Sequence, residues 1–296
     1  NYLFAKCTSL TDVTLPANLT VIPKYMFSEC TSLTTITLPA GITEIGDNAF
    51  NKAGLTEITI PATVKSIGSS AFSGASKGKG TLVKVTFAKD KDGNCALTSI
   101  GSNAFRFQNI VSIVIPKSVT TIGNYAFATN LDLTSFTFES GTKITTFGTY
   151  IFSTCEKLPT FTVPKSVTTL GNYSFESCTA LKEVIFEEGS KLTATGTYTF
   201  KKSGIVSIVF PDSLKIVGTT KATAPSASSS GNLFDSCESL TSVTFGKNVT
   251  HINGKTFINC TALTKVNIPD TVTQIGVSTF EGCTSLKSVE FGENSK

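Results

Sequence analysis

Histidine, methionine, arginine and tryptophan are nearly absent from this chain, whose 296 residues include one His, one Met, one Arg and no Trp. Because His251 is the only imidazole, a two-histidine metal site is impossible, and any serine or cysteine triad would have to use that residue. No nucleophile, base and oxyanion donor can be assembled from such a composition. We therefore expect no enzyme activity, no metal site and no cofactor.

Charge and hydropathy exclude two further classes of partner. The formal net charge of +4 comes from scattered lysines, and Arg106 alone offers a forked guanidinium, so nucleic acid is not an expected partner. No run of about 18 apolar residues is present, so this segment is not expected to insert into a membrane. We expect a monomer.

Threonine and phenylalanine are abundant instead, with 47 Thr and 22 Phe. Together with Val and Ile, residues of this kind favour strands over helices. An apolar content of 40% with only 16% charged residues is typical of a folded chain rather than a disordered one. The composition predicts a mostly β protein with a sizeable core.

A repeat runs through the whole chain and is marked by phenylalanine. Nine of the eleven intervals between successive repeat Phe residues lie between 22 and 25. These residues are Phe4, Phe27, Phe50, Phe72, Phe105, Phe127, Phe152, Phe175, Phe200, Phe234, Phe257 and Phe280. Each is followed by a segment of alternating apolar residues, and then by a second short apolar segment that ends before a glycine. Because one such unit cannot bury its apolar face alone, we expect a right-handed solenoid of about 12 stacked coils.

The segment between the glycine and the next Phe is expected to turn sharply. Gly46 and its equivalents favour positive φ, and the residues 46–50 carry polar capping residues before an Ala-Phe pair. We therefore predict short helical turns whose Phe residues fill the interior of each coil.

Two insertions interrupt the period without changing its phase. They lie at about 73–94 and at 219–231, and residues 1–296 are therefore predicted to form one domain. The chain begins and ends within a repeat, and no polar terminal cap is recognisable, so we expect a fragment of a longer protein.

The repeat resembles the BspA-type, or treponemal-type, leucine-rich repeat. The clearest matches run from Cys30-Thr31-Ser32-Leu33 to Phe50 and from Cys260-Thr261-Ala262-Leu263 to Cys283. The resemblance implies a leucine-rich-repeat fold without catalytic activity. It also implies a secreted or cell-surface bacterial protein that adheres to host or matrix proteins.

Seven of the eight cysteines lie three residues after a repeat Phe. Ala53, Ala75 and Ser203 occupy the same position in other coils, so the position is predicted to need a small buried side chain. Disulfides between neighbouring coils remain possible at Cys7/Cys30, at Cys155/Cys178 and among Cys237, Cys260 and Cys283. The sequence assigns no role to Cys95.

Three weaker motifs are better explained by structure than by chemistry. Asp90, Asp92 and Asn94 imitate the start of a calcium loop, but the glycine and glutamate that such a loop needs are missing, so a turn is predicted. Residues 74–80 are rich in Gly and Lys without the spacing of a phosphate loop. His251 is expected to point outward from a strand.

The best candidate for a functional site is the row of outward side chains on the first strand of each coil. In stacked strands these side chains form two long columns. We call the following sixteen residues the strand face: Thr35, Thr37, Glu57, Thr59, Thr86, Ser112, Val114, Ser135, Thr137, Thr160, Thr162, Glu183, Ile185, Ser207, Val209 and Thr244.

Two functions compete for such a chain. The first is a binding or adhesion module, extracellular or at the cell surface, whose strand face contacts a host or extracellular-matrix protein or a glycan. The second is a structural stalk that displays another domain. An ice-binding surface is disfavoured, because only Thr35/Thr37 and Thr160/Thr162 present the paired threonines that a regular array requires.

Overall fold

The computed structural model describes residues 2–219 and 230–293, which form two compact units, 1–144 and 145–296. Each unit is described by itself. Of the second predicted insertion, residues 220–229 lie outside the described residues. All regular elements in the described part are strands, and no helix there has the length and hydropathy of a membrane span.

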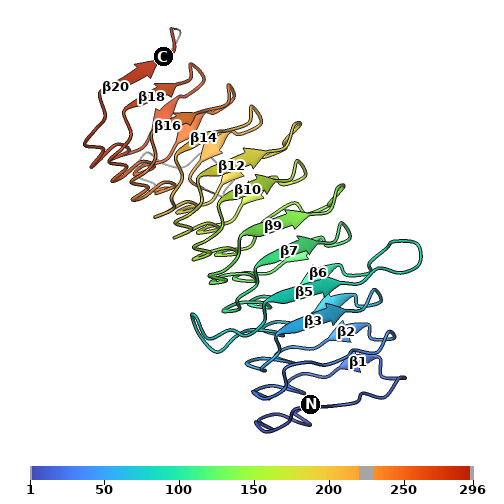
Figure 1. Ribbon diagram of the computed structural model, residues 1–296. Coiled ribbons are helices and arrows are strands. Elements are labelled where there is room, and N and C mark those ends of the chain that lie inside the picture. Colours follow the sequence, from blue (N-terminus) through green and yellow to red (C-terminus); the bar gives the residue numbers. More distant parts are fainter. Residues whose placement is uncertain (1, 220–229, 294–296) are drawn as a thin grey trace. The chain divides into compact units, whose positions relative to one another are not determined.

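The first strand of each coil is the longer one, and these strands stack side by side within each unit (Figure 1). In the first unit they are β3 (Glu57–Ile60), β5 (Lys84–Phe87), β7 (Ser112–Ile115) and β9 (Ser135–Phe138). In the second unit they are β10 (Thr160–Val163), β12 (Glu183–Phe186), β14 (Ser207–Val209), β16 (Ser242–Thr244), β18 (Lys265–Ile268) and β20 (Ser288–Phe291).

The second strand of each coil is only two residues long, and these strands form one parallel five-stranded sheet in each unit. The first sheet contains β1 (Val21–Ile22), β2 (Glu44–Ile45), β4 (Ser66–Ile67), β6 (Ser99–Ile100) and β8 (Thr121–Ile122). The second contains β11 (Thr169–Leu170), β13 (Ala194–Thr195), β15 (Ile216–Val217), β17 (His251–Ile252) and β19 (Gln274–Ile275). The predicted parallel-strand solenoid is confirmed.

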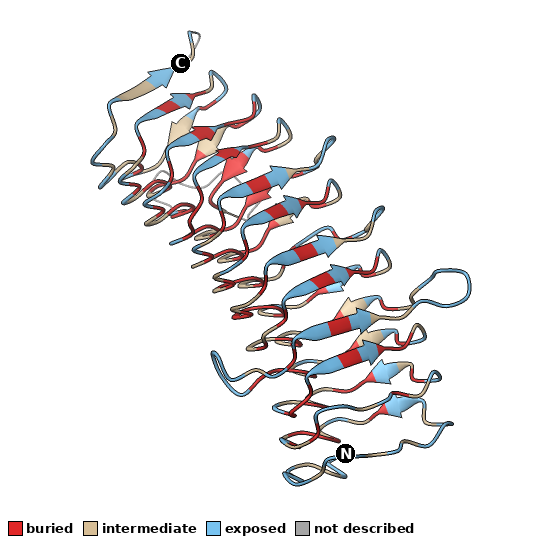
Figure 2. Cartoon of the chain, viewed as in Figure 1, coloured by how far each residue is buried: buried red, intermediate tan, exposed pale blue. Residues whose placement is uncertain are grey.

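Burial alternates along the longer strands, as the apolar pattern predicts. In β3 the side chains of Ile58 and Ile60 are buried, whereas Glu57 and Thr59 are exposed. Figure 2 shows the same alternation of buried and exposed residues on the neighbouring strand arrows. The strands therefore fix which side chains reach the core and which remain on the surface.

The longer strands do not form the continuous sheet that the two predicted columns imply. In the second unit they pair as β10-β12, β14-β16 and β18-β20, and in the first unit β5 and β7 are joined only at Lys84 and Ser112. Wherever pairing is lost or reduced, the later strand is followed by proline, at Pro116, Pro211 and Pro269. In the coils of β9 and β12, Glu139 and Glu187 occupy the position of these prolines. The backbone N–H of Glu139 donates a hydrogen bond of 2.9 Å to the preceding coil, and that of Glu187 donates one of 3.1 Å. Proline has no N–H, so that bond cannot form.

The predicted helical turns are wrong. Each repeat Phe is flanked by a residue with positive φ two positions before it, as in Tyr25 (59°) and Tyr173 (55°). Alternate amides in this segment bond to the next coil instead of to their own, for example Tyr25 N to Asp47 O at 3.0 Å and Phe27 N to Ala49 O at 2.7 Å. A helix would use these amides locally, so stacking between coils replaces it.

The prediction that the repeat glycines have positive φ is confirmed at Gly218 (85°) and is wrong at the others. Gly46, Gly101 and Gly171 do not have positive φ. A Cβ at Gly171 would lie 2.5 Å from the carbonyl oxygens of Phe147 and Gly148 in the preceding coil. Glycine is required here because two backbones approach closely, not because the chain turns.

The repeat phenylalanines form the core of each unit, as predicted. Their rings stack from coil to coil at centroid distances of 5.2–5.4 Å in the first unit and 5.3–5.6 Å in the second. Phe175 and its neighbour Phe200 are completely buried. Within each unit the stacked rings pack each coil against the next and hold the outward strand side chains in register.

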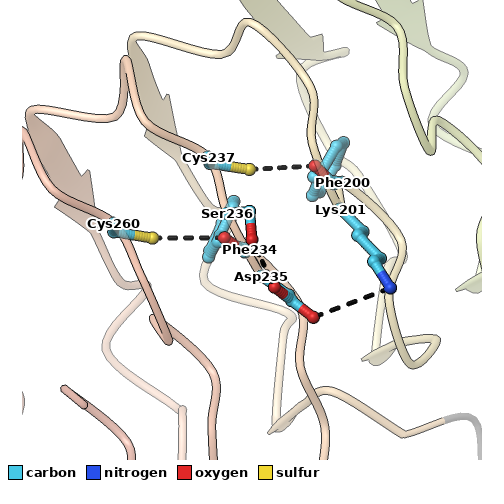
Figure 3. Close-up of polar contacts among 7 residues, drawn as sticks. All are labelled: Phe200, Lys201, Phe234, Asp235, Ser236, Cys237 and Cys260. Carbon is cyan, nitrogen blue, oxygen red and sulfur yellow. Dashed lines mark hydrogen bonds and ion pairs between the residues drawn. The ribbon is translucent and has the colours of Figure 1, made fainter. Parts of the chain in front are cut away.

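In several coils the residue three positions after the repeat Phe donates a side-chain hydrogen bond as well as filling space, although Ala53 and Ala75 at the same position cannot. Cys237 Sγ donates to Phe200 O at 2.9 Å, and Cys260 Sγ donates to Phe234 O at 3.2 Å (Figure 3). The buried amides of Gln108 and Asn130 occupy the same position and bond to Phe72 O at 2.6 Å and Phe105 O at 2.9 Å. The prediction of a small side chain was therefore incomplete, because a longer donor also fits.

All eight cysteines are free thiols in the structure, so none of the possible disulfides is present. Burial raises the pKa of Cys237 to about 12 and raises that of Cys178 well above its ordinary value. A buried thiol that stays protonated is a poor nucleophile and a poor metal ligand. The buried cysteines Cys30, Cys155, Cys178, Cys237 and Cys260 are therefore structural.

Candidate binding face

All sixteen residues of the strand face are exposed. The strand registers place them in columns within each unit, with Thr59 beside Thr86 in the first and Thr160 beside Glu183 in the second. Thr35 and Thr37 are exposed but lie in an extended segment that forms no strand, contrary to the prediction. Their coil is followed by that of β3, whose last residue precedes Pro61, so the same missing N–H explains the missing ladder.

The threonines of the strand face differ chemically from other threonines in the chain. Many Thr residues next to a strand donate their hydroxyl to a carbonyl of the preceding coil, at 3.0–3.3 Å. They are Thr43, Thr56, Thr98, Thr120, Thr134, Thr168, Thr193, Thr241, Thr250 and Thr273. In contrast, the hydroxyls of the strand-face threonines make no hydrogen bond to any residue that the structure describes. Their hydroxyls are available to an external partner.

Exposed aliphatic side chains interrupt the hydroxyl columns. Val114, Ile185 and Val209 are 55%, 44% and 65% exposed, respectively. Val111 and Val206, which directly precede β7 and β14, add to them and were not in the predicted set. They could have been found from the sequence, because the residue before each longer strand is exposed in coil after coil, as at Thr56 and Thr134.

Few ion pairs lie on the face. Glu57 and Lys84 approach within 4.0 Å in the first unit, and Lys265 and Glu290 within 2.7 Å in the second. All four side chains are exposed, so each pair contributes about 0–1 kcal/mol to stability. The face is therefore largely uncharged hydroxyl and methyl surface.

A cavity of about 470 Å³ opens on the face between β12 and β14. It is lined by Ile185 and Val209, and by the acidic residues at and after the ends of the two strands. This is one of the positions where proline, here Pro211, interrupts the ladder. The amide and the ammonium group of Lys247 bond to Asp212 at the rim, which holds the pKa of that carboxyl below its ordinary value.

The other motifs of the sequence have structural explanations. Asp90 Oδ1 accepts hydrogen bonds from Asp92 N at 2.9 Å and Asn94 N at 2.8 Å, which makes the predicted turn. Lys89 from the same insertion forms an ion pair with Glu139 at 2.6 Å. His251 is half-buried rather than fully solvated, and its Nδ1 lies 2.8 Å from Thr250 Oγ1.

Tyrosine has a fixed place in the repeat that was not predicted from the sequence. All six tyrosines lie two residues before a repeat Phe. In the second unit Tyr150, Tyr173 and Tyr198 stack with centroid distances of 4.3 and 4.7 Å, and the ammonium group of Lys201 lies 4.9 Å from the Tyr198 ring. The ring faces pack against one another, so this column stabilises the stack of coils.

Parallel strands stacked coil on coil, and a stack of Phe rings with one ring from each coil, are the features of a leucine-rich-repeat solenoid. The chain belongs to the BspA type leucine rich repeat family, whose model matches residues 1–88, 98–222 and 227–296 in six copies. No curated protein sequence matches the chain.

Solved structures of bacterial leucine-rich-repeat proteins are similar to this chain. One from Bacteroides ovatus ATCC 8483 is 30% identical with a TM-score of 0.69, over 90% of this chain and 69% of that one. A leucine rich cell surface protein from Faecalibacterium prausnitzii A2-165 is 23% identical with a TM-score of 0.52, over 98% and 75% of the two chains. The pneumococcal vaccine antigen PcpA is 24% identical with a TM-score of 0.54, over 96% and 75%. Because the last two proteins are less than 25% identical to this chain, their similarity shows only that the fold is shared.

Proposed function

We propose that this chain is a non-catalytic binding module, extracellular or at the cell surface, whose strand face contacts a host or extracellular-matrix protein or a glycan. One observation carries the proposal: the strand-face threonines leave their hydroxyls exposed and without a hydrogen bond within the described residues, whereas threonines beside the strands bond to the backbone. A rigid ladder of such side chains offers many weak contacts at fixed spacing. The cell-surface protein of similar fold supports the location.

The experiment replaces three strand-face residues by lysine, as Thr59→Lys, Val114→Lys and Thr162→Lys in one variant. Binding is measured to immobilised matrix proteins and to a glycan array. The control variant places the same added charge on outward positions of the short strands, as Val21→Lys, Thr121→Lys and Gln274→Lys. We expect the face variant to lose binding at least tenfold while the control retains it.

Two outcomes would contradict the proposal. Equal loss in both variants would show that charge, not the strand face, is responsible. If the unmodified chain binds nothing on either panel, the structural stalk becomes the better explanation, since a spacer needs a rigid solenoid but no exposed ligand surface.

A further inference from the structure

The cavity between β12 and β14 has an apolar floor that is unusual on this face. Ile185 and Val209 are exposed aliphatic side chains in adjacent coils, at a position where Thr162 and Thr244 stand in the flanking coils. Val206 adds a third exposed aliphatic beside them. Leaving such side chains in water is unfavourable by about 25 cal/mol per Å² of apolar surface, so a partner that covers them gains binding free energy.

This cavity, called the groove below, exists because β12 and β14 are not hydrogen-bonded to each other along their length. No ladder pairs join β12 to β14, and Pro211 lacks the amide that Glu187 uses to close the preceding pair. The hydroxyl of Ser213, which lines the same cavity, is buried and has no hydrogen-bond partner in the described part of the chain. Polar groups in this state favour a ligand that supplies a partner.

The rim of the groove is acidic in a chain of net positive charge. The lining contains four carboxylates, Glu183, Glu187, Glu188 and Asp212, and neither Lys nor Arg. Asp212 is paired with Lys247, and Glu187 accepts the Lys165 amide at 2.8 Å. The carboxylates of Glu183 and Glu188 make no hydrogen bond or ion pair with the described residues, so they are available to an external cation.

We propose that this groove binds an extended, basic segment of a partner protein. Its aliphatic side chains contact Ile185 and Val209, and its lysine or arginine side chains pair with Glu183 and Glu188. This assignment rests on the proposed function, because it names the chemistry of a partner for the same face. The four-residue strand β12 is about 13 Å long, which matches an extended segment of about four to six residues.

The test uses a labelled eight-residue peptide of alternating Lys and Val, with binding followed by fluorescence anisotropy at low ionic strength. One variant carries Glu183→Gln and Glu188→Gln. A second carries Ile185→Thr and Val209→Thr, which restores the residue type of the flanking coils. Each variant is expected to weaken binding about five- to tenfold. Glu44→Gln and Val21→Thr, which remove a carboxylate and an aliphatic side chain from exposed positions of the short strands outside the strand face, are controls and should leave binding unchanged.

Peptides of alternating Glu and Val, or of Lys and Ser, separate specific docking from simpler attraction. The acidic peptide should not bind, and the Lys-Ser peptide should bind at least fivefold more weakly. The assignment is overturned if the acidic peptide binds equally well, or if Ile185→Thr with Val209→Thr has no effect. The two proposals can fail separately. If the Thr59, Val114 and Thr162 lysine variant loses binding to its matrix ligand, but the groove variants bind the peptide as well as the unmodified chain does, only the groove assignment fails.

Discussion

The thiol of Cys237 donates a 2.9 Å hydrogen bond to the main-chain carbonyl of Phe200, one coil earlier in the stack. Both residues are completely buried. The same contact recurs between Cys178 and Phe152 at 3.1 Å. A single side chain therefore fills space beside the phenylalanine ladder and satisfies a carbonyl that has no water to bond.

The raised pKa of these thiols predicts how stability depends on pH. An unfolded thiol titrates near its ordinary pKa of 9.0, whereas Cys237 in the folded chain titrates at about 12. The neutral thiol is thus favoured by folding, and its contribution is complete below pH 9 and is lost as the pH rises towards 12. Ionisation of Cys237 should lower the free energy of unfolding by about 1.4 kcal/mol per pH unit in that window.

Urea unfolding of the unmodified chain and of Cys237→Ser, between pH 8 and pH 10.5, measures this dependence. Serine keeps a donor at the position, as at Ser203, but does not titrate. The difference in unfolding free energy between the two proteins should narrow as the pH increases, because lysines and tyrosines titrate equally in both. A constant difference would contradict the assignment of a buried, protonated Cys237.

The phenylalanine ladder and the exposed columns could be predicted from the sequence because each depends on a pattern that repeats in every coil. Phe175 meets Phe200 because their spacing equals one coil, and Thr160 faces outward because Phe161 faces inward. Such regularities need no knowledge of the coil's conformation between the strands.

The turns could not be predicted in this way, because their conformation is set by the neighbouring coil. Tyrosine ordinarily avoids positive φ, so nothing local to Tyr25 indicates it. The hydrogen bond from Tyr25 N to Asp47 O, 22 residues later, imposes the conformation. By contrast, the division of the sheet could have been predicted from the sequence. Pro116, Pro211 and Pro269 occupy the repeat position at which Glu139 and Glu187 donate a backbone hydrogen bond to the preceding coil.

Substitution of Gly171 should strongly destabilise the fold, because the backbone of the preceding coil lies close to its Cα. Its φ is not positive, so Gly171→Ala adds only a methyl group, which would lie 2.5 Å from two carbonyl oxygens of the preceding coil. We expect a loss of about 3 kcal/mol or more in unfolding free energy, because backbone cannot yield as a side chain can. Thermal and urea unfolding measure the loss.

Gly189 provides the matched control for that substitution. Its φ is 74°, and a Cβ there would have nothing within 4 Å. Gly189→Ala should therefore cost only about 1 kcal/mol, from backbone strain alone. If Gly189→Ala proved as harmful as Gly171→Ala, positive φ rather than close packing would dominate, and close approach of backbones would not explain the repeat glycines.

Pro211 can be tested as the cause of the gap between β12 and β14. In Pro211→Ala the new amide corresponds to that of Glu187, which donates to Val163 O at 3.1 Å, and so it should donate to Phe186 O. The added bond contributes about 0.5–1.5 kcal/mol, offset in part by the greater freedom of the unfolded chain. Hydrogen exchange should reveal a protected amide at position 211 and slower exchange along β14.

The reverse change, Glu187→Pro, removes the equivalent bond and should weaken protection along β12. Proline already stands at the same repeat position in the preceding coil, at Pro164. If Pro211→Ala gained no protection while Glu187→Pro left the β10-β12 pair intact, the missing amide would not be the cause. The separation of the strands would then have to come from the bulky Phe186 and Phe210 rings, whose centroids lie 5.9 Å apart at the ends of the two strands.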